Sequence, residues 1–85
     1  MEGNKVHLFL INDHENTFKY VWAVLMEHLK HNPIQAEQCC LITDNVGQCH
    51  IKSGDVVEMT KTKEKLIELG LKVELRQEIN EEGRT

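Results

Sequence analysis

The most constraining feature of this sequence is an abrupt change from a strand pattern to a helix pattern near residue 12. An unbroken apolar or ring-bearing run, Val6–Ile11, is rich in strand-forming residues and predicts a strand over Lys5–Ile11. After a polar link, apolar residues recur at the steps of an amphipathic helix: Phe18, Val21, Trp22, Leu25 and Leu29. Asn12 and Asp13 therefore stand between strand and helix, where short polar side chains can form an Asx turn or hold a ligand.

Capping and turn residues predict the elements that follow. The expected spans are helices over Thr17–His31, Pro33–Ile42 and Asp55–Leu69, and strands over Gln48–Lys52 and Leu71–Leu75. Asp44–Gly47 has the composition of a turn, and Ser53-Gly54 is expected to end the second strand. The apolar residues of the second helix, expected to be buried, are Ile34, Ala36, Cys40 and Leu41.

The order of these elements, βααβαβ, predicts an α+β fold. A two-layer domain, with a three-stranded sheet carrying the helices on one face, accounts for three short strands and three amphipathic helices. The 85 residues suffice for one domain. We expect residues 5–76 to form its core, and residues 77–85, which are polar and acidic, to be disordered.

Composition limits the classes of partner. The formal charge of -4 argues against a nucleic-acid binder, because the phosphate backbone is contacted mainly by Lys and Arg. Three cysteines, two of them adjacent, do not make a disulfide framework, so a cytoplasmic location is expected. Nor does any apolar run approach the roughly 18 residues that would span a membrane.

Motifs for metal binding or catalysis are weak. His28 and His31 lie three residues apart, but a structural zinc site needs four converging ligands, and no recognised spacing supplies them. Cys39, Cys40 or Cys49 could act as a nucleophile, yet nothing places a base beside them. We therefore expect neither an enzyme nor a cofactor, although a small thiol enzyme stays an alternative.

Several short segments, in order along the chain, carry a resemblance. They are Leu10-Ile11-Asn12-Asp13, Phe18-Lys19-Tyr20-Val21, Gln35-Ala36-Glu37-Gln38, Gly47, Glu58 with Thr62-Lys63, and Leu71-Lys72-Val73-Glu74-Leu75. Together they resemble the ClpS family, adaptors of the Clp (Hsp100) ATP-dependent protease that recognise N-degrons, proteins marked by a bulky hydrophobic first residue. The resemblance covers about residues 5–76. It implies the same βααβαβ fold, which the ribosomal stalk domain shares.

The resemblance also implies a binding site. Asn12 and Asp13 match the family's ligands for the free α-amino group, and Asp44 stands where the family has a histidine. The matching positions of the hydrophobic pocket are Phe18, Val21, Val24, Cys40, Thr43 and Leu71. Glu58 and Lys63 match residues that face the N-terminal domain of the Clp ATPase. The implied protein is a monomeric adaptor with these partners.

This sequence departs from the family pattern in several places. A carboxylate at Asp44 could hold the ammonium, or Asp44 could simply begin a turn. Phe18 replaces a frequent methionine, and it could guard the pocket entrance or belong to the core. The long N-terminal extension that the protease engages in the family is expected to be absent. An interaction domain that keeps the fold without binding N-degrons is the alternative function.

Overall fold

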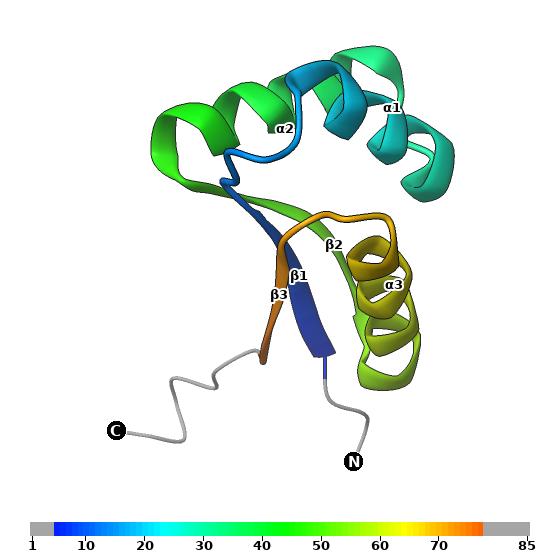
Figure 1. The fold of residues 1–85 in the computed structure, drawn as a ribbon. Coiled ribbons are helices and arrows are strands. Elements are labelled where there is room, and N and C mark those ends of the chain that lie inside the picture. The colour runs from blue at the N-terminus through cyan, green and yellow to red at the C-terminus, as the bar shows by residue number, and fades with distance from the viewer. Residues whose placement is uncertain (1–4, 78–85) are drawn as a thin grey trace.

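A three-stranded antiparallel sheet with β1 in the middle organises the chain in a computed structural model that describes residues 5–77. The elements are β1 (Lys5–Ile11), α1 (Phe18–Leu29), α2 (Pro33–Val46), β2 (Gln48–Asp55), α3 (Val56–Glu68) and β3 (Val73–Gln77). The strand order is β2-β1-β3. The predicted α+β class and the order βααβαβ are confirmed (Figure 1).

The helices occupy two positions relative to this sheet. α3 contacts all three strands, whereas α1 packs against α2, and α2 also contacts β2. Figure 1 shows α1 and α2 together at the end of the sheet where β1 finishes. The link between β1 and α1 therefore passes beside the α1–α2 pair, and this arrangement positions the candidate site.

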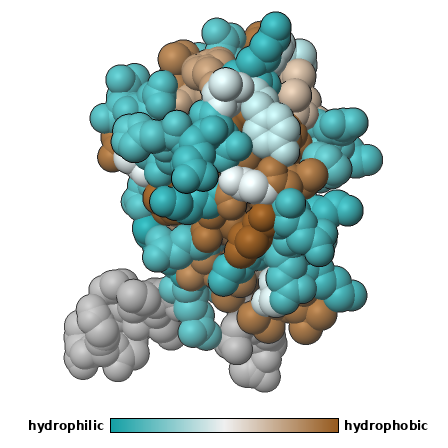
Figure 2. Space-filling model, in the orientation of Figure 1, coloured by the Kyte–Doolittle hydropathy of each residue, from teal (hydrophilic) through white to brown (hydrophobic). Residues whose placement is uncertain are grey.

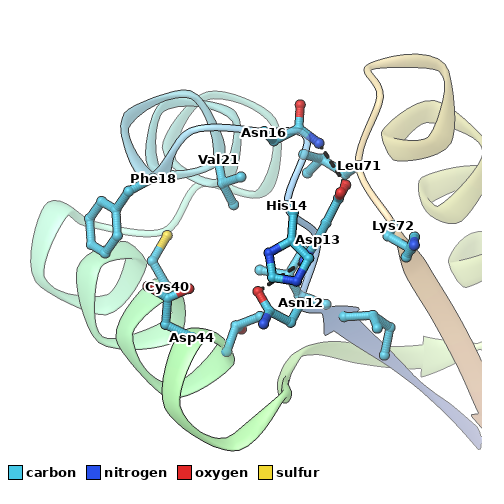
Figure 3. A pocket seen from close by; sticks show the side chains of 13 residues that line it. Asn12, Asp13, His14, Asn16, Phe18, Val21, Cys40, Asp44, Leu71 and Lys72 are labelled. Atoms are coloured by element: carbon cyan, nitrogen blue, oxygen red, sulfur yellow. Dashed lines mark hydrogen bonds between the residues drawn. The ribbon is translucent and has the colours of Figure 1, made fainter.

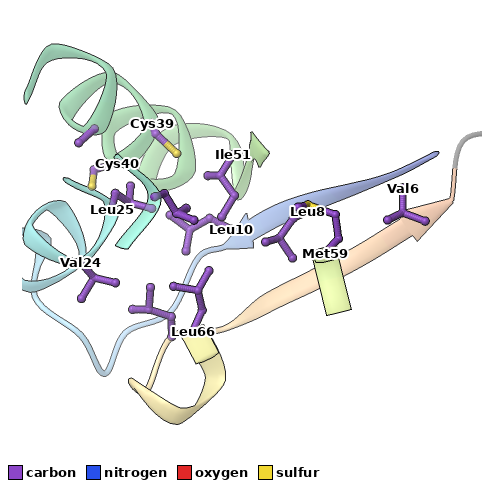
Figure 4. Packing of buried hydrophobic residues seen from close by; sticks show 13 residues of the cluster. Val6, Leu8, Leu10, Val24, Leu25, Cys39, Cys40, Ile51, Met59 and Leu66 are labelled. Carbon is purple, nitrogen blue, oxygen red and sulfur yellow. The ribbon is translucent and has the colours of Figure 1, made fainter. Parts of the chain in front are cut away.

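The core follows from the alternation of β1. Val6, Leu8 and Leu10 are buried on one face of this strand, and they meet the buried residues of the helices (Figure 4). Leu8, Leu25, Met59 and Leu66 are the largest fully buried side chains. In space-filling view, apolar residues emerge between the α1–α2 pair and α3, surrounded by polar ones (Figure 2).

The prediction for the buried face of α2 is wrong at two positions. Ile34 and Leu41 are 70% and 41% exposed, respectively, whereas Ala36 and Cys40 are buried as expected. The buried residues of α2 are Ala36, Cys39, Cys40 and Thr43, which share one face at helical spacing. Because α2 carries apolar residues on two faces, contact with α1 and β2 decides which face is buried.

Three predicted boundaries also need correction. α2 continues through Asp44 to Val46, because Gly47 caps the helix with φ 104° and donates its N–H to the Thr43 carbonyl at 2.9 Å. β2 runs through Ser53-Gly54 to Asp55, because these residues still pair with β1. β3 begins at Val73, so Leu71 precedes the strand.

The predicted tail can be judged only at its first residue. Gln77, assigned to the tail over 77–85, ends β3 and pairs with Val6. The disorder expected for residues 78–85 lies outside the described residues.

Candidate functional site

The loop after β1 is held on both sides as it leaves the sheet. The Ile11 N–H donates to the Lys72 carbonyl at 2.9 Å, and the Asn12 N–H donates to the Gly47 carbonyl at 2.9 Å. The first bond ties the loop to the segment before β3, and the second ties it to the cap of α2. Asn12 and Asp13 are thereby fixed between these two elements.

Asp13 forms the Asx turn that was one of the two interpretations. Its Oδ1 accepts from the Glu15 N–H at 2.8 Å, and its Oδ2 accepts from the Asn16 side-chain amide at 2.9 Å. The Asn12 side-chain oxygen accepts from the Asp13 N–H at 2.9 Å. An ionised carboxylate has about four acceptor positions, so these bonds leave Asp13 able to accept further donors.

Asn16 and Tyr20 connect this loop to the chain that follows α3. The Asn16 amide also donates to the Gly70 carbonyl at 2.8 Å, and the Tyr20 hydroxyl donates to the Leu69 carbonyl at 2.5 Å. Thr17 is the N-cap of α1. These bonds hold the segment containing Leu71 against α1, and Leu71 is only 4% exposed.

A cavity of about 430 Å³ lies between the loop, the start of α1 and the second half of α2 (Figure 3). All the predicted amine-binding and pocket residues line it except Val24: they are Asn12, Asp13, Asp44, Phe18, Val21, Cys40, Thr43 and Leu71. Leu10, Ile11, His14, Asn16 and Lys72 also line it and were not predicted. Because several elements contribute, sequence spacing alone does not identify these five.

Val24 does not line this cavity. It is buried at 5% exposure and belongs to the main core. Val24 lies one turn beyond Val21, so the same stripe of α1 reaches first the cavity and then the core. Of the pocket positions that the resemblance implies, Val24 is therefore the one that the structure places outside this lining.

Burial separates the floor of the cavity from its rim. Leu10, Cys40, Thr43 and Leu71 are buried and form the floor, and Val21 beside them is half-buried. The exposed members are His14, Phe18, Asp44 and Lys72, which therefore lie at the rim. Phe18 is 40% exposed, so it belongs to the rim and not to the core.

The rim combines opposite charges. Asp13 and Asp44 bring two carboxylates to one opening, and Lys72 is the ammonium group among the lining residues. The carboxylates come from different elements, the loop after β1 and the last part of α2. Such an opening favours a ligand with a cationic group close to an apolar one.

The thiols next to this cavity are neutral. Burial, and to a smaller extent the nearby Asp44 carboxylate, raises the pKa of Cys40 to about 11. Burial, followed by contact with the Cys49 thiol, also raises the pKa of Cys39. Since the thiolate is the nucleophile, neither thiol is activated for catalysis at neutral pH.

Alkylation with iodoacetamide at pH 7.5 is therefore expected to modify Cys49 first. Cys49 is partly exposed, whereas Cys39 and Cys40 are buried and hold their protons. Intact-mass and peptide-mass spectra at successive times would give the order. Modification of Cys40 before Cys49 would show that the floor of the cavity is more open than the structure indicates.

Glu58 and Lys63 lie away from the cavity on α3, which contributes no residue to its lining. Glu58 is exposed in the first turn, where its N–H donates to the capping Asp55 side chain at 2.8 Å. Lys63 is half-buried. Five positions separate them, about 140° around the helix, so they occupy different faces of α3.

The residues that the structure describes contain neither a metal-binding cluster nor a membrane-spanning helix. Within residues 5–77 no group of three or more His, Cys, Asp or Glu side chains could hold a metal ion. His31 instead contacts the Ile51 carbonyl through Nε2 at 3.1 Å. Across the same residues, every helix is too short or too polar to cross a bilayer.

Comparison with known proteins identifies the family. A solved structure of Agrobacterium tumefaciens ClpS2 bound to L-phenylalaninamide superposes with a TM-score of 0.86 over 91% of this chain and 100% of that one, at 13% sequence identity. No curated protein matches the sequence. The family model described as ATP-dependent Clp protease adaptor protein ClpS matches residues 1–74. This chain therefore belongs to the ClpS family of Clp protease adaptors.

Proposed function

We propose that this adaptor captures proteins through a free N-terminus with a bulky hydrophobic first residue and presents them to a Clp AAA+ ATPase. The observation that carries the proposal is a cavity with a largely apolar floor and two carboxylates, Asp13 and Asp44, in its lining. An N-terminal residue has the matching chemistry, because its ammonium lies two bonds from the start of its own side chain. No covalent step is needed, so the proposed role is binding and not catalysis.

In this proposal, three side chains hold the α-amino group. An ammonium has three donors and needs converging acceptors, which Asn12, Asp13 and Asp44 can supply from the rim. Each charge-assisted bond contributes roughly 1.5–3 kcal/mol when sheltered from water. Asp44 adds a second negative charge at the position where the family has a histidine. An acetylated N-terminus would leave these carboxylates without a cation.

The side chain of the substrate's first residue is proposed to occupy the space above the floor of the same cavity. Val21, Cys40, Thr43 and Leu71 surround that space, and Phe18 stands at its entrance. Burial of a Leu- or Phe-sized side chain contributes roughly 1.5–3 kcal/mol. The similar Agrobacterium protein was solved with L-phenylalaninamide, which combines a free amine with a phenyl side chain. That combination supports the same chemistry here.

Delivery is assigned to α3. Glu58 and Lys63, although on different faces of α3, are both proposed to contact the N-terminal domain of the ATPase. They lie outside the cavity, so substrate and ATPase can bind at the same time. We propose a monomeric cytoplasmic protein. An interaction domain that has lost N-degron binding is the second candidate, since both Asp13 carboxylate oxygens already accept bonds within their own loop.

The deciding experiment is a calorimetric titration with three peptides that differ only at the N-terminus. A Phe-first peptide is expected to bind at least about ten times more tightly than its acetylated copy, because one charge-assisted bond is worth roughly a factor of ten or more. An Ala-first peptide is expected to bind weakly. Equal affinity for the free and acetylated peptides, or no binding at millimolar concentration, would favour the second candidate.

A further inference from the structure

Thr43 gives the floor of the cavity a polar group. Among residues 5–77, it is the polar side chain in the buried class, with 6% exposure, and it lines the same cavity as Asp13. Its hydroxyl donates to the Cys39 carbonyl, one turn earlier in α2, at 2.8 Å. That bond fixes where the single hydroxyl proton of Thr43 points.

The remaining hydrogen-bonding capacity of Thr43 is that of an acceptor. A threonine hydroxyl has one proton and two lone pairs, so an oxygen that already donates can still accept. The neighbouring Cys40 thiol is protonated and is at best a weak donor. The floor can therefore accept a hydrogen bond well but donate one only poorly.

We propose that this cavity selects aromatic first residues that carry a hydrogen-bond donor, with tyrosine preferred over phenylalanine. The inference rests on the proposed function. With the ammonium held at the rim, an aromatic side chain would extend toward the buried floor, and its far end would meet Thr43. The tyrosine phenol O–H can donate to a lone pair of the Thr43 hydroxyl. Phenylalanine has no donor for it.

Burial places Thr43 at the depth that this selection needs. It belongs with Leu10, Cys40 and Leu71, which are 3%, 5% and 4% exposed, whereas Asp44, one residue later on α2, is exposed at the rim. Consecutive positions on a helix point about 100° apart, so α2 directs one side chain to the rim and the preceding one to the floor. Amine recognition and side-chain selection thus come from adjacent residues.

The test compares Tyr-first and Phe-first peptides of otherwise identical sequence. The wild-type chain is expected to bind the Tyr-first peptide about 3- to 10-fold more tightly, the effect of one net hydrogen bond. Thr43→Val keeps the shape and removes the oxygen, so it should abolish or reverse this ratio. Thr43→Ser, which keeps the hydroxyl, should preserve the ratio.

A modified peptide tests the same inference on the wild-type protein, in case Thr43→Val does not fold. A peptide beginning with O-methyltyrosine keeps the phenolic oxygen but has no donor, and it should bind wild type no better than the Phe-first peptide. Equal wild-type affinities for Tyr-first and Phe-first peptides would overturn the inference and leave the proposed function standing. A ratio that survives Thr43→Val would also overturn it. Failure of every free peptide to bind would reject both.

Discussion

Replacing Asp13 by asparagine is expected to weaken binding of an unblocked Phe-first peptide by about 10- to 100-fold. The expected loss is that of one charge-assisted hydrogen bond, roughly 1.5–3 kcal/mol. Asparagine retains a side-chain oxygen that can accept from the Glu15 N–H, so the Asx turn can persist. The bond from the Asn16 amide to Oδ2 is lost, because an amide nitrogen cannot accept it, but the Asn16 bond to the Gly70 carbonyl remains. Isothermal titration calorimetry would measure the two affinities.

Glu15→Gln is the matched control for this variant. It removes the same charge from the same loop, but Glu15 does not line the cavity. Its effect on affinity should be less than about twofold, because exposed charges outside a contact are screened by solvent and salt. An equal loss in both variants would mean that only the general negative field matters, and that Asp13 makes no specific contact with the ammonium.

Replacing Leu8 by alanine should lower the free energy of unfolding by about 2–5 kcal/mol. Leu8 is fully buried on the central strand, and its side chain contributes to the core beneath the helices (Figure 4). Small domains have roughly 5–15 kcal/mol of total stability, so the variant could lose a large share of it. Urea denaturation followed by circular dichroism would give the difference.

Ile34→Ala is the companion variant. Ile34 is 70% exposed, so its truncation should change the free energy of unfolding by no more than about 0.5 kcal/mol. Comparison of Leu8→Ala with Ile34→Ala also tests the structure against the sequence-based prediction, in which Ile34 was expected to be buried. If Ile34→Ala lowered the free energy of unfolding by about 2 kcal/mol or more, as expected for a buried residue, the result would support the predicted burial of Ile34.

The fold could be predicted because its local signals agree. β1 alternates toward one buried face, and the apolar stripe of α1 includes Leu25, which is fully buried. α2 is different, because Asp44-Asn45-Val46-Gly47 suits a turn as well as the end of a helix. In the structure the helix continues to Val46, and the Gly47 N–H donates to the Thr43 carbonyl as its cap. Local composition does not encode that choice.

The candidate site was predictable only in part. The junction between strand and helix drew attention to Asn12 and Asp13, which line the cavity, and the family resemblance named six further residues that line it. The polar bonds that shape the cavity could not be found in this way. Asn16 meets Gly70 across 54 positions and Tyr20 meets Leu69 across 49, so no local pattern connects them.

Those two long-range bonds have a kinetic consequence for binding. Because Asn16 and Tyr20 hold the Leu69–Gly70 turn in place, the adjacent Leu71 wall does not have to be ordered when a ligand arrives. Association would then be limited by diffusion and orientation, and differences in affinity among first residues would reside in the dissociation rate. A short dwell time for poorly matched N-termini would let the adaptor sample many proteins before it retains one.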